Sequence, residues 1–452
     1  MIGFDFGTSN CAVGIIVAQI PQVLKLGEHG SFMPSTLYAP SRDIIVNHLH
    51  QRLSTEQQTL FAKQRQRQLQ KGNNVLRELR LDGIPTDLHF GQQALSHYLD
   101  EPDEGYYLKS PKSFLGASGL LPQQIELFED IVAAMMAHIK TLTEQNLQRE
   151  VTQTVIGRPI NFQGLKGEES NQQAITILTN AAKRVGYKNV EFQYEPVAAG
   201  LEFEASLTQE SKVLVVDIGG GTTDCSMLIM SPEFKSQLNR DQHLLGYSGQ
   251  RIGGNDFDIQ LALKGIMPQF GMQGLLKTGK PIPTNSYWQA VAINNIYEQT
   301  DFYSAANGRY LAELALDAKC PEEIARLIKV HKEKLSYQIV NDAEQAKIIL
   351  SAQPEHKIDL NYIEEQLSTS VTPNTLLDSS QRELSAIGEL MHECVQQAGC
   401  QPDVIFVTGG TAKSPVLAKF LQSQFPQKEL IVGDHFGSVT AGLARYAQLM
   451  FG

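Results

Sequence analysis

The sequence is poor in cysteine and tryptophan, and its cysteines form no recognisable framework. Among 452 residues there are five cysteines and one tryptophan. An odd, scattered set without a CxxC pair argues against a disulfide scaffold, which needs paired and regularly spaced thiols. We therefore expect a reducing compartment, in which the thiols serve as small apolar side chains. The cysteines are Cys11, Cys225, Cys320, Cys394 and Cys400.

The sequence also lacks an excess of basic residues and a long apolar run. Lysine and arginine number 38 against 49 aspartate and glutamate residues, which gives a net charge of −11. Nucleic acids and anionic membranes are therefore excluded as general partners, because both need a basic surface. No apolar run approaches the roughly 20 residues of a membrane helix, and the first residues lack the basic start of a signal peptide. We expect a cytoplasmic protein.

What the sequence does contain is a repeated strand–turn–strand pattern. Residues 2–17 and 213–230 each read as an apolar strand that ends in aspartate, a turn rich in glycine and hydroxyl groups, and a second apolar strand. The aspartates are Asp5 and Asp217, about half a chain apart. Because the chain exceeds the roughly 100–200 residues of one domain, we interpret the repeat as a duplication that builds two lobes.

Helix and strand periodicities alternate around the two hairpins. The pattern predicts helices at 124–147, 168–185 and from Glu195 onward, with strands at 151–157 and 190–194. It also predicts a strand at 403–407, a turn at 408–411, a helix that runs to residue 425 and a closing helix at 438–448. This order is typical of an α/β protein with helices on a largely parallel or mixed sheet. Two stretches break the rhythm and are interpreted as insertions: 43–81, expected to be helical on the surface, and 255–350, mostly helical.

The two glycine turns carry the strongest chemical signal. Glycines let backbone N–H groups approach phosphate oxygens, and a carboxylate at the end of each first strand suits a hydrated Mg²⁺ ion. The alternative is two structural hairpins in which glycine serves only the turn. Because the pattern occurs twice, each time with its aspartate, we favour a polyphosphate site between two opposing hairpins.

The glycine turns and their aspartates resemble the motifs of the actin, hexokinase and heat-shock chaperone superfamily. Within it, the chain is most similar to the ATPase domain of the seventy-kilodalton heat-shock (DnaK-type) chaperones, and specifically to their shortened YegD-like relatives. The motifs that carry the resemblance span the chain in the family's order. They are Asp5-x-Gly7-Thr8-x-Asn10, Lys112-Ser-Phe-Leu-Gly116, Glu195-Pro196-Val-Ala-Ala199, Asp217-x-Gly219-Gly220-Gly221-Thr222-x-Asp224, Gly253-Gly254-Asn255-Asp256-Phe257-Asp258, Glu344-Gln-Ala-Lys347-Ile-Ile-Leu-Ser351 and Val407-Thr408-Gly409-Gly410-Thr411.

The resemblance implies a role for each matching residue. It implies that Asp5 and Asp217 orient the waters of a Mg²⁺ ion, and that Lys112 positions the attacking water. The implied catalytic residues are Asp5, Lys112, Glu195, Asp217, Thr222 and Asp224. The implied nucleotide-binding residues are Gly7, Thr8, Ser9, Asn10, Gly219, Gly220, Gly221, Gly253, Gly254, Glu344, Lys347, Ser351, Gly409, Gly410 and Lys413. Pro159 matches a proline that switches with nucleotide state in the family.

Several residues depart from the family pattern. In the family, two cationic side chains sandwich the adenine. Here Ile348 stands at one of these positions and Lys413 replaces the usual arginine at the other, and lysine stacks less well than a planar guanidinium. This predicts weak adenine affinity or a relaxed choice of base. Gln172 stands near the position of an arginine that relays the proline switch. The sequence ends at Gly452, so the resemblance implies an ATPase domain without the peptide-binding domain.

The implied fold is a two-lobed, actin-like α/β ATPase with duplicated, ribonuclease-H-like mixed sheets. We expect lobe I at 1–205, with an inserted subdomain at about 38–117, and expect the closing helix at 434–452 to return to it. We expect lobe II at 206–433, with an inserted helical subdomain at about 255–370.

The implied function is slow hydrolysis of ATP to ADP with Mg²⁺, with K⁺ as an optional second cation. Lobe closure would then signal the nucleotide state to an unknown protein partner or co-chaperone. Two alternatives remain open from the residues: a small-molecule kinase of the sugar-kinase type, and a non-catalytic nucleotide sensor or actin-like filament subunit.

Two further patterns are only weak indications of a phosphate-binding loop or a metal site. Residues 274–280 nearly spell a phosphate-binding loop, but Pro281 stands where serine or threonine should follow, so we expect an ordinary loop. His48, His50 and His392 have no partners at metal-ligand spacing, and we expect surface or hydrogen-bonded histidines.

Overall fold

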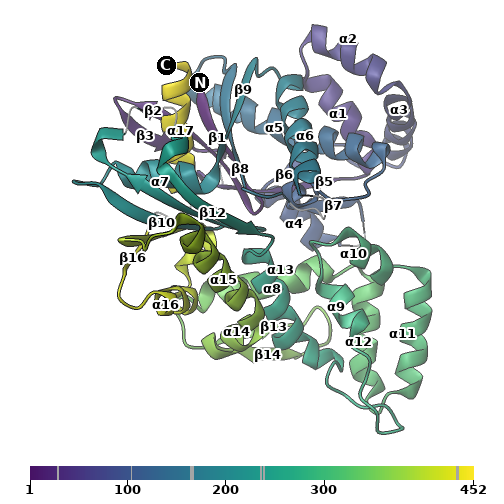
Figure 1. The fold of residues 1–452 in the computed structure, drawn as a ribbon. Coiled ribbons are helices and arrows are strands. Elements are labelled where there is room, and N and C mark those ends of the chain that lie inside the picture. The colour runs from purple at the N-terminus through teal and green to yellow at the C-terminus, as the bar shows by residue number, and fades with distance from the viewer. Residues whose placement is uncertain (28–29, 103, 163–166, 235–236, 238–239, 434–436) are drawn as a thin grey trace.

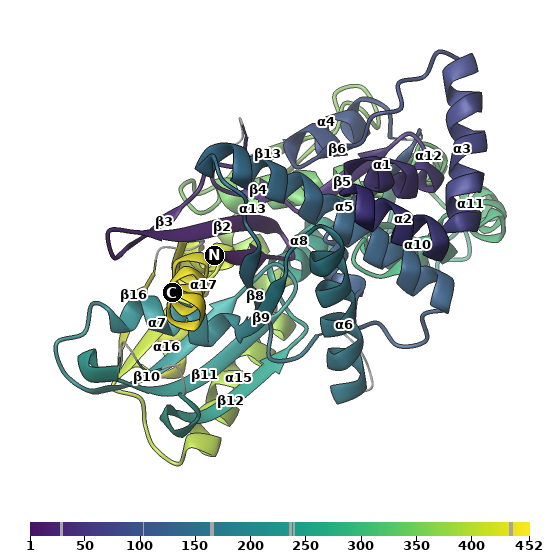
Figure 2. The same ribbon diagram turned by 90° about the horizontal axis from the view of Figure 1, so that it is seen from above.

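The computed structural model describes all residues except 28–29, 103, 163–166, 235–236, 238–239 and 434–436. Figure 1 shows two halves, each with its own sheet and covering helices, and Figure 2 shows the same arrangement from above. The chain ends lie side by side in both views, because the last helix returns to the sheet on which the chain begins.

The first half is built on a six-stranded mixed sheet. Its strand order is β3-β2-β1-β8-β9, with β4 paired to β2. The strands β1 and β2 form an antiparallel hairpin, whereas β8 and β9 run parallel to β1. The strands are β1 (Ile2–Phe6), β2 (Asn10–Val17), β3 (Ile20–Val23), β4 (Met33–Pro34), β8 (Gln153–Arg158) and β9 (Asn189–Tyr194).

The second half repeats this plan. Its five-stranded sheet has the order β12-β11-β10-β15-β16, in which β10 and β11 form an antiparallel hairpin and β15 and β16 run parallel to β10. The strands are β10 (Ser211–Ile218), β11 (Thr223–Met230), β12 (Leu244–Gln250), β15 (Val404–Thr408) and β16 (Glu429–Val432). Two sheets with the same order, each starting from a glycine-turn hairpin, establish the duplicated, two-lobed α/β fold that the sequence predicts.

Helices cover both sheets. Those of the first half are α5 (Pro122–Leu147), α6 (Glu168–Arg184), α7 (Glu195–Glu204) and α17 (Gly437–Phe451). Those of the second half are α8 (Gly254–Leu261), α14 (Pro373–Ser379), α15 (Gln381–Ala398) and α16 (Pro415–Gln424). The closing helix α17 packs on α7 and on β1. This contact needs Gly442, because a Cβ atom there would lie 1.7 Å from the carbonyl oxygen of Ala198.

Further elements extend each half away from its sheet. In the first half they are β5 (Thr36–Ala39), α1 (Ile45–Arg52), α2 (Thr55–Gln64), α3 (Gln66–Leu81), β6 (His89–Phe90), α4 (Gln92–Asp100), β7 (Tyr106–Lys109) and the 3₁₀ helix Pro111–Phe114. In the second half they are α9 (Asn285–Val291), α10 (Ile296–Phe302), α11 (Ala305–Asp317), α12 (Pro321–Lys332), α13 (Ser336–Ile349), β13 (His356–Asp359) and β14 (Ser368–Val371). The lobe and subdomain boundaries expected from the sequence stay a prediction.

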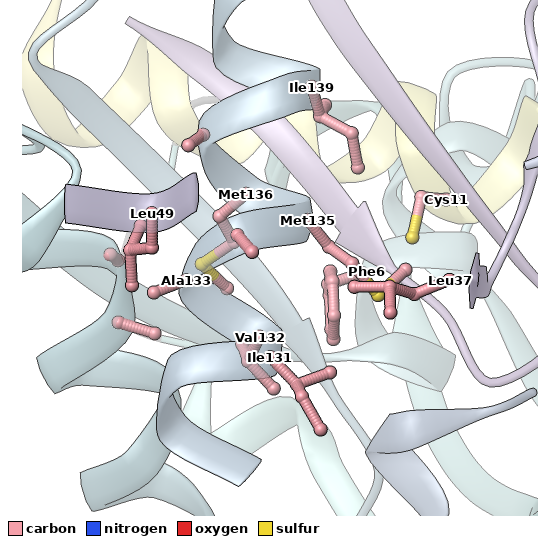
Figure 3. Packing of buried hydrophobic residues seen from close by; sticks show 14 of the residues in the cluster. Phe6, Cys11, Leu37, Leu49, Ile131, Val132, Ala133, Met135, Met136 and Ile139 are labelled. Atoms are coloured by element: carbon pink, nitrogen blue, oxygen red, sulfur yellow. The ribbon is translucent and has the colours of Figure 1, made fainter. Parts of the chain in front are cut away.

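The core of the first half is centred on α5. Figure 3 shows this helix directing Ile131, Met135 and Ile139, among others, toward residues of the sheet and of α1 such as Phe6 and Leu49. These side chains are buried. Because most of α5 is enclosed, its interior positions are occupied by aliphatic and methionine side chains that fill space without needing hydrogen bonds.

The stretch 43–81 agrees with the expectation of a helical surface segment over α2 and α3, which are largely exposed, but not over α1. It is helical, but α1 buries apolar side chains and Arg65 is only 6% exposed. The Arg65 guanidinium lies 2.9 Å from Asp130 and 3.3 Å from Glu129, both on α5. The polar composition misled the prediction because this arginine is buried together with its own counter-ions.

Two histidines, His48 of α1 and His138 of α5, flank Phe90 of β6. The ring centroids of His138 and His48 lie 4.5 Å and 6.1 Å from that of Phe90. Burial, followed by the charge of Arg52, lowers the pKa of each histidine to about 4. The expectation of a surface or hydrogen-bonded His48 was therefore wrong, and its Nε2 atom has no hydrogen-bond partner among the described residues.

These histidines predict acid sensitivity. A folded-state pKa below the unfolded value of about 6.5 means that unfolded chains take up more protons as the pH falls from about 6.5 toward 4, so stability is lost over that range. Each ring is expected to cost about 1–2 kcal/mol between pH 7 and pH 5. Buried carboxyl groups with raised pKa values, such as Asp5 and Asp224, act in the opposite direction, so the loss is measured by comparing the thermal unfolding of the wild type with that of His138→Phe. Between pH 7 and pH 5 the variant should gain about 1–2 kcal/mol of stability relative to the wild type. An unchanged pH slope in the variant would contradict the assignment.

Candidate functional site

The turns of the two repeated hairpins lie against each other. A Cβ atom on Gly220 would stand 2.0 Å from Ser9 Oγ and 3.0 Å from the Ser9 backbone nitrogen. A Cβ atom on Gly221 would stand 2.8 Å from the methyl group of Thr8. Only glycine permits this approach, so the glycines of the second turn are explained by contact with the first.

A cavity of about 400 Å³ opens beside this contact. Both hairpins, the start of α7, the helix α13 and the turn after β15 contribute to its wall. The lining residues are Asp5, Gly7, Thr8, Ser9, Asn10, Glu195, Asp217, Gly219, Gly220, Thr222, Gly254, Glu344, Lys347, Ile348, Ser351, Gly409, Gly410, Thr411, Ser414 and Val439. Most of the residues singled out from the sequence are thus brought to one place from segments far apart in the chain.

Glycines keep side chains out of this cavity wall. A Cβ atom on Gly7 would lie 2.3 Å from the Asn10 carbonyl oxygen. Gly409 has a φ of +91°, and a Cβ there would lie 2.2 Å from the Ile218 carbonyl oxygen. The resulting bare backbone can bring N–H groups close to an anion.

Lys112 lies behind the lining and is held by Glu195. Its Nζ atom lies 2.5 Å from Glu195 Oε1 and donates to the Gly157 carbonyl oxygen at 3.2 Å. Lys112 is only 4% exposed. Burial opposes the charged form, but Glu195 and then Asp5 outweigh it, so the pKa of Lys112 is raised and the ammonium stays charged. Of these two residues, Glu195 lines the cavity and Lys112 lies behind it.

The buried carboxyl groups outnumber this one ammonium. Burial, and next the charge of Glu195, raises the pKa of Asp5 to about 7 and that of Asp217 well above its ordinary value. The same two causes raise the pKa of Asp224 to about 7. Such a concentration of acidic groups favours a bound cation, because a cation would relieve the repulsion between the carboxylates. No group of three or more direct metal-ligating side chains occurs in the described parts of the chain.

Asp224 does not reach the cavity. Its Oδ1 atom accepts the backbone N–H of Ile160 at 2.8 Å and thereby ties the second hairpin to the segment that contains Pro159. Its carboxyl group also lies close enough to Thr222, Glu195 and Lys112 for them to shift its pKa, so its expected place in the polar shell stays a prediction. Asp224 sits directly opposite Asp217 in the antiparallel ladder, so the two side chains project from the same face of the sheet.

Two other expected residues, Gly221 and Gly253, also lie outside the lining. Gly221 and Gly253 belong to the supporting backbone: a Cβ on Gly253 would lie 2.6 Å from the Gly221 nitrogen. Lys413 ends the 3₁₀ helix Gly410–Lys413, and its side chain is outside the described part of the structure. Gln172 lies on α6, where its amide contacts Thr176 at 3.3 Å, away from the cavity.

The far end of the cavity is formed by α13 and by the turn after β15. Glu344 Oε2 lies 2.5 Å from Lys109 Nζ, and Lys347 Nζ lies 2.6 Å from Asp258 Oδ1. Burial raises the pKa of Asp258 to about 6, although Lys347 works against this shift. Ile348 is 55% exposed at the cavity edge.

Sequence reasoning missed several residues of the site. Thr411, Ser414 and Val439 line the cavity without having been selected. Thr411 ends a glycine motif and could have been found from it, whereas Val439 carries no local signal because only the return of α17 places it there. The segment 274–280 forms a turn closed by a bridge between Leu275 and Pro281, as expected of an ordinary loop.

This fold and this cavity define a class of protein: a two-lobed, actin-like α/β protein with a glycine-lined, acidic cleft between its repeated hairpins. The family model described as "Hsp70 protein" matches residues 123–273. The chain is 24% identical over 432 residues to "Chaperone protein DnaK" of Carsonella ruddii, covering 92% of this chain and 63% of that protein. The chain is thus similar to Hsp70 proteins over residues 123–273 and to a DnaK chaperone over most of its length.

Two further relatives are "Chaperone protein HscA homolog" proteins. The one from Histophilus somni strain 129Pt is 26% identical over 262 residues, covering 58% of this chain and 36% of the relative. The one from Pseudoalteromonas atlantica is 24% identical over 276 residues, covering 61% and 38%. The chain thus spans less than two thirds of the length of each of these relatives. Among the described residues, no helix has the length and apolar character to span a membrane.

Proposed function

We propose that this chain binds ATP and ADP in the interlobe cavity and hydrolyses ATP slowly in a chaperone-like cycle. The single observation that carries this proposal is the contact between the two glycine turns beside an acidic cavity. Bare turn backbone suits a polyphosphate, and lobes joined at such a cavity can close around a ligand. The nucleotide state would then be read by a protein partner, and we propose the cytoplasm as the location.

The residues present fit a Mg²⁺ ion bound with the nucleotide. Asp5 and Asp217 line the cavity from opposite hairpins, and their raised pKa values reflect buried carboxyl groups without enough positive charge. Mg²⁺ retains several waters and needs only one or two carboxylates besides phosphate oxygens, so these two aspartates would hold it through water. When bound, the ion would neutralise phosphate charge.

The chain's own contribution to hydrolysis would centre on Lys112 and Glu195. Lys112 would place a fixed positive charge toward the transferred phosphoryl group, and Glu195 would keep it oriented and accept a hydrogen bond from water. Thr8 and Thr222, on opposite hairpins, would add hydroxyl donors. Positioning and electrostatic stabilisation are most of what phosphoryl transfer needs from a protein.

The base end of the cavity supports only weak discrimination between purines. Ile348 offers an exposed aliphatic surface where a stacking cation would be expected. Glu344, Lys347 and Ser351 would instead contact the sugar and the base edge. We therefore expect ATP to be preferred over GTP by less than about ten-fold, because a hydrophobic contact rejects a wrong base poorly.

Calorimetric titration with ATP, ADP and GTP tests this proposal. We expect one ATP or ADP to bind per chain, with clearly weaker binding when Mg²⁺ is withheld. Phosphate release should not depend on added sugars, whereas sugar-dependent release of ADP would favour the kinase alternative. Binding without any phosphate release would favour a nucleotide sensor, and absence of binding would overturn the proposal.

A further inference from the structure

The helix α3 carries positive charge on the outer edge of the first half. Figures 1 and 2 both show α3 at the periphery, away from the two sheets. Its 16 residues include the basic side chains Arg67, Lys71, Arg77 and Arg80 and a single acidic one, Glu78. The whole chain, by contrast, has a net charge of −11. Positive charge is therefore concentrated on one peripheral helix of an acidic protein.

Only one side of α3 is used for packing. Gly72 brings this side against α1 and the short turn before it, because a Cβ atom there would lie 1.8 Å from Asn47 Oδ1 and 2.5 Å from the Asp43 carbonyl oxygen. Gly72 and Leu76, about one turn apart, are the buried residues of α3. With 3.6 residues per turn, the opposite side of the helix is made of other, exposed residues. They are Arg67, Gln70, Asn74, Arg77 and Leu81, with Arg80 at the margin, and we call them the basic face.

The charges of the basic face are not neutralised by the described parts of the chain. Lys71, at the side of the helix, pairs with Asp43 at 2.9 Å. Arg67, Arg77 and Arg80 are exposed and form no ion pair with any described residue. An arginine side chain keeps its charge and offers five N–H donors in a planar fork that matches a carboxylate. These three side chains are therefore available to the acidic groups of a partner.

A groove of about 520 Å³ lies between the end of α1 and the second half of α3. Its lining residues are Gln51, Asn73, Leu76, Arg77, Arg80 and Leu81. No acidic residue is among them, and Leu81 is 80% exposed. Guanidinium groups beside an exposed leucine suit a ligand that has both carboxylates and apolar side chains.

The surroundings favour an acidic protein segment over a nucleic acid or a membrane. A nucleic acid is a long polyanion, which the chain's net charge of −11 repels beyond the basic face. Membrane binding needs a continuous apolar face, whereas the buried side of α3 already packs on α1. From Arg67 to Leu81 the basic face is about 20 Å long, the length of a helical segment of about 14 residues. Such a segment fits the face in both length and charge.

We propose that the basic face of α3 binds an acidic, leucine-containing helical segment of a partner protein. Arg67, Arg77 and Arg80 pair with its carboxylates, and the groove beside Leu81 accepts one of its apolar side chains. None of these residues lines the interlobe cavity. The inference is therefore independent of the proposed nucleotide binding, and it is tested on the nucleotide-free chain.

Fluorescence anisotropy with a labelled peptide tests the proposal. The probe is a helical peptide of about 14 residues made of glutamate, leucine and alanine, which spans about 20 Å. We expect the double variant Arg77→Gln with Arg80→Gln to bind it about five- to ten-fold more weakly than the wild type, and Arg67→Gln about two- to three-fold more weakly. Raised salt should weaken binding to the wild type more than to the double variant. A peptide with alanine in place of leucine should bind about three-fold more weakly.

The matched control is the double variant Arg309→Gln with Arg382→Gln. It removes two exposed arginines from α11 and α15, which form no ion pair with any described residue, so the net charge changes by the same amount. It should bind the peptide like the wild type. Because all the substituted arginines are exposed, every variant should keep the wild-type melting temperature.

No binding of the peptide, or equal binding by the wild type and the Arg77 and Arg80 double variant, would overturn the proposal. Tighter binding of a single-stranded oligonucleotide, or of vesicles that contain anionic lipid, would also overturn it, because a protein segment would then not be the favoured occupant. Amide hydrogen exchange locates the bound peptide. Protection of α3 and of the end of α1 would support the basic face, and protection of other segments alone would contradict it.

Discussion

Replacement of Lys112 by methionine is expected to lower the rate of ATP hydrolysis by about 100- to 1,000-fold. The physical reason is its position: Lys112 is buried, paired with Glu195 at 2.5 Å and kept charged by the surrounding carboxylates. Methionine has a similar length but no charge, so it removes the electrostatic contribution and little packing. Phosphate release under single-turnover conditions measures the effect.

Loss of the lysine also leaves Glu195 without its counter-ion, so folding needs its own control. The double variant Lys112→Met with Glu195→Gln removes both charges and should recover the stability that the single variant loses. It should not recover hydrolysis. Lys71→Met controls for the loss of an exposed lysine. Equal hydrolysis by the wild type and Lys112→Met would remove Lys112 from the mechanism.

Replacement of Gly442 by alanine is expected to destabilise the protein by about 3 kcal/mol or more. Glycine to alanine in an ordinary helix interior stabilises by about 1 kcal/mol, because alanine loses less backbone entropy. Here the new methyl group would lie 1.7 Å from the Ala198 carbonyl oxygen, and backbone of α7 cannot yield as a side chain can. The contact between α17 and α7 would have to open. Urea denaturation followed by circular dichroism measures the change.

Gly388→Ala is the matched control, because Gly388 also lies within a helix, α15. A Cβ atom there would meet Gln424 Oε1 at 2.8 Å, the far end of a flexible side chain that can rotate away. We expect its effect to stay within about 1 kcal/mol of zero. If Gly442→Ala proved no more destabilising than Gly388→Ala, the close packing of α17 on α7 would be wrong.

The two hairpins were predictable because all their information is local. Apolar alternation, a terminal aspartate and a glycine turn specify a strand–turn–strand unit within about 15 residues, and the second copy suggested a duplication. The pairing of Lys112 with Glu195 had no such local basis. Their separation in sequence gives no indication of contact, and only the resemblance to chaperone ATPases pointed to either residue.

The errors have a common physical origin. The segment 43–81 was expected on the surface because it is polar, yet its Arg65 is buried with acidic residues of α5. His48 was expected to be at the surface or hydrogen-bonded, yet its ring lies against Phe90 of β6 and its Nε2 atom has no hydrogen-bond partner among the described residues. In both cases the partner that decides the environment lies on another element.

The sequence by itself determined the class of fold, the two glycine turns and the aspartates that end their first strands, because periodicity and turn chemistry act over a few residues. The tertiary structure alone decided that Ser9 meets Gly220, that Val439 lines the cavity and that Lys109 reaches Glu344. Such contacts join segments tens to hundreds of residues apart. They depend on how helices and sheets pack, which no local pattern encodes.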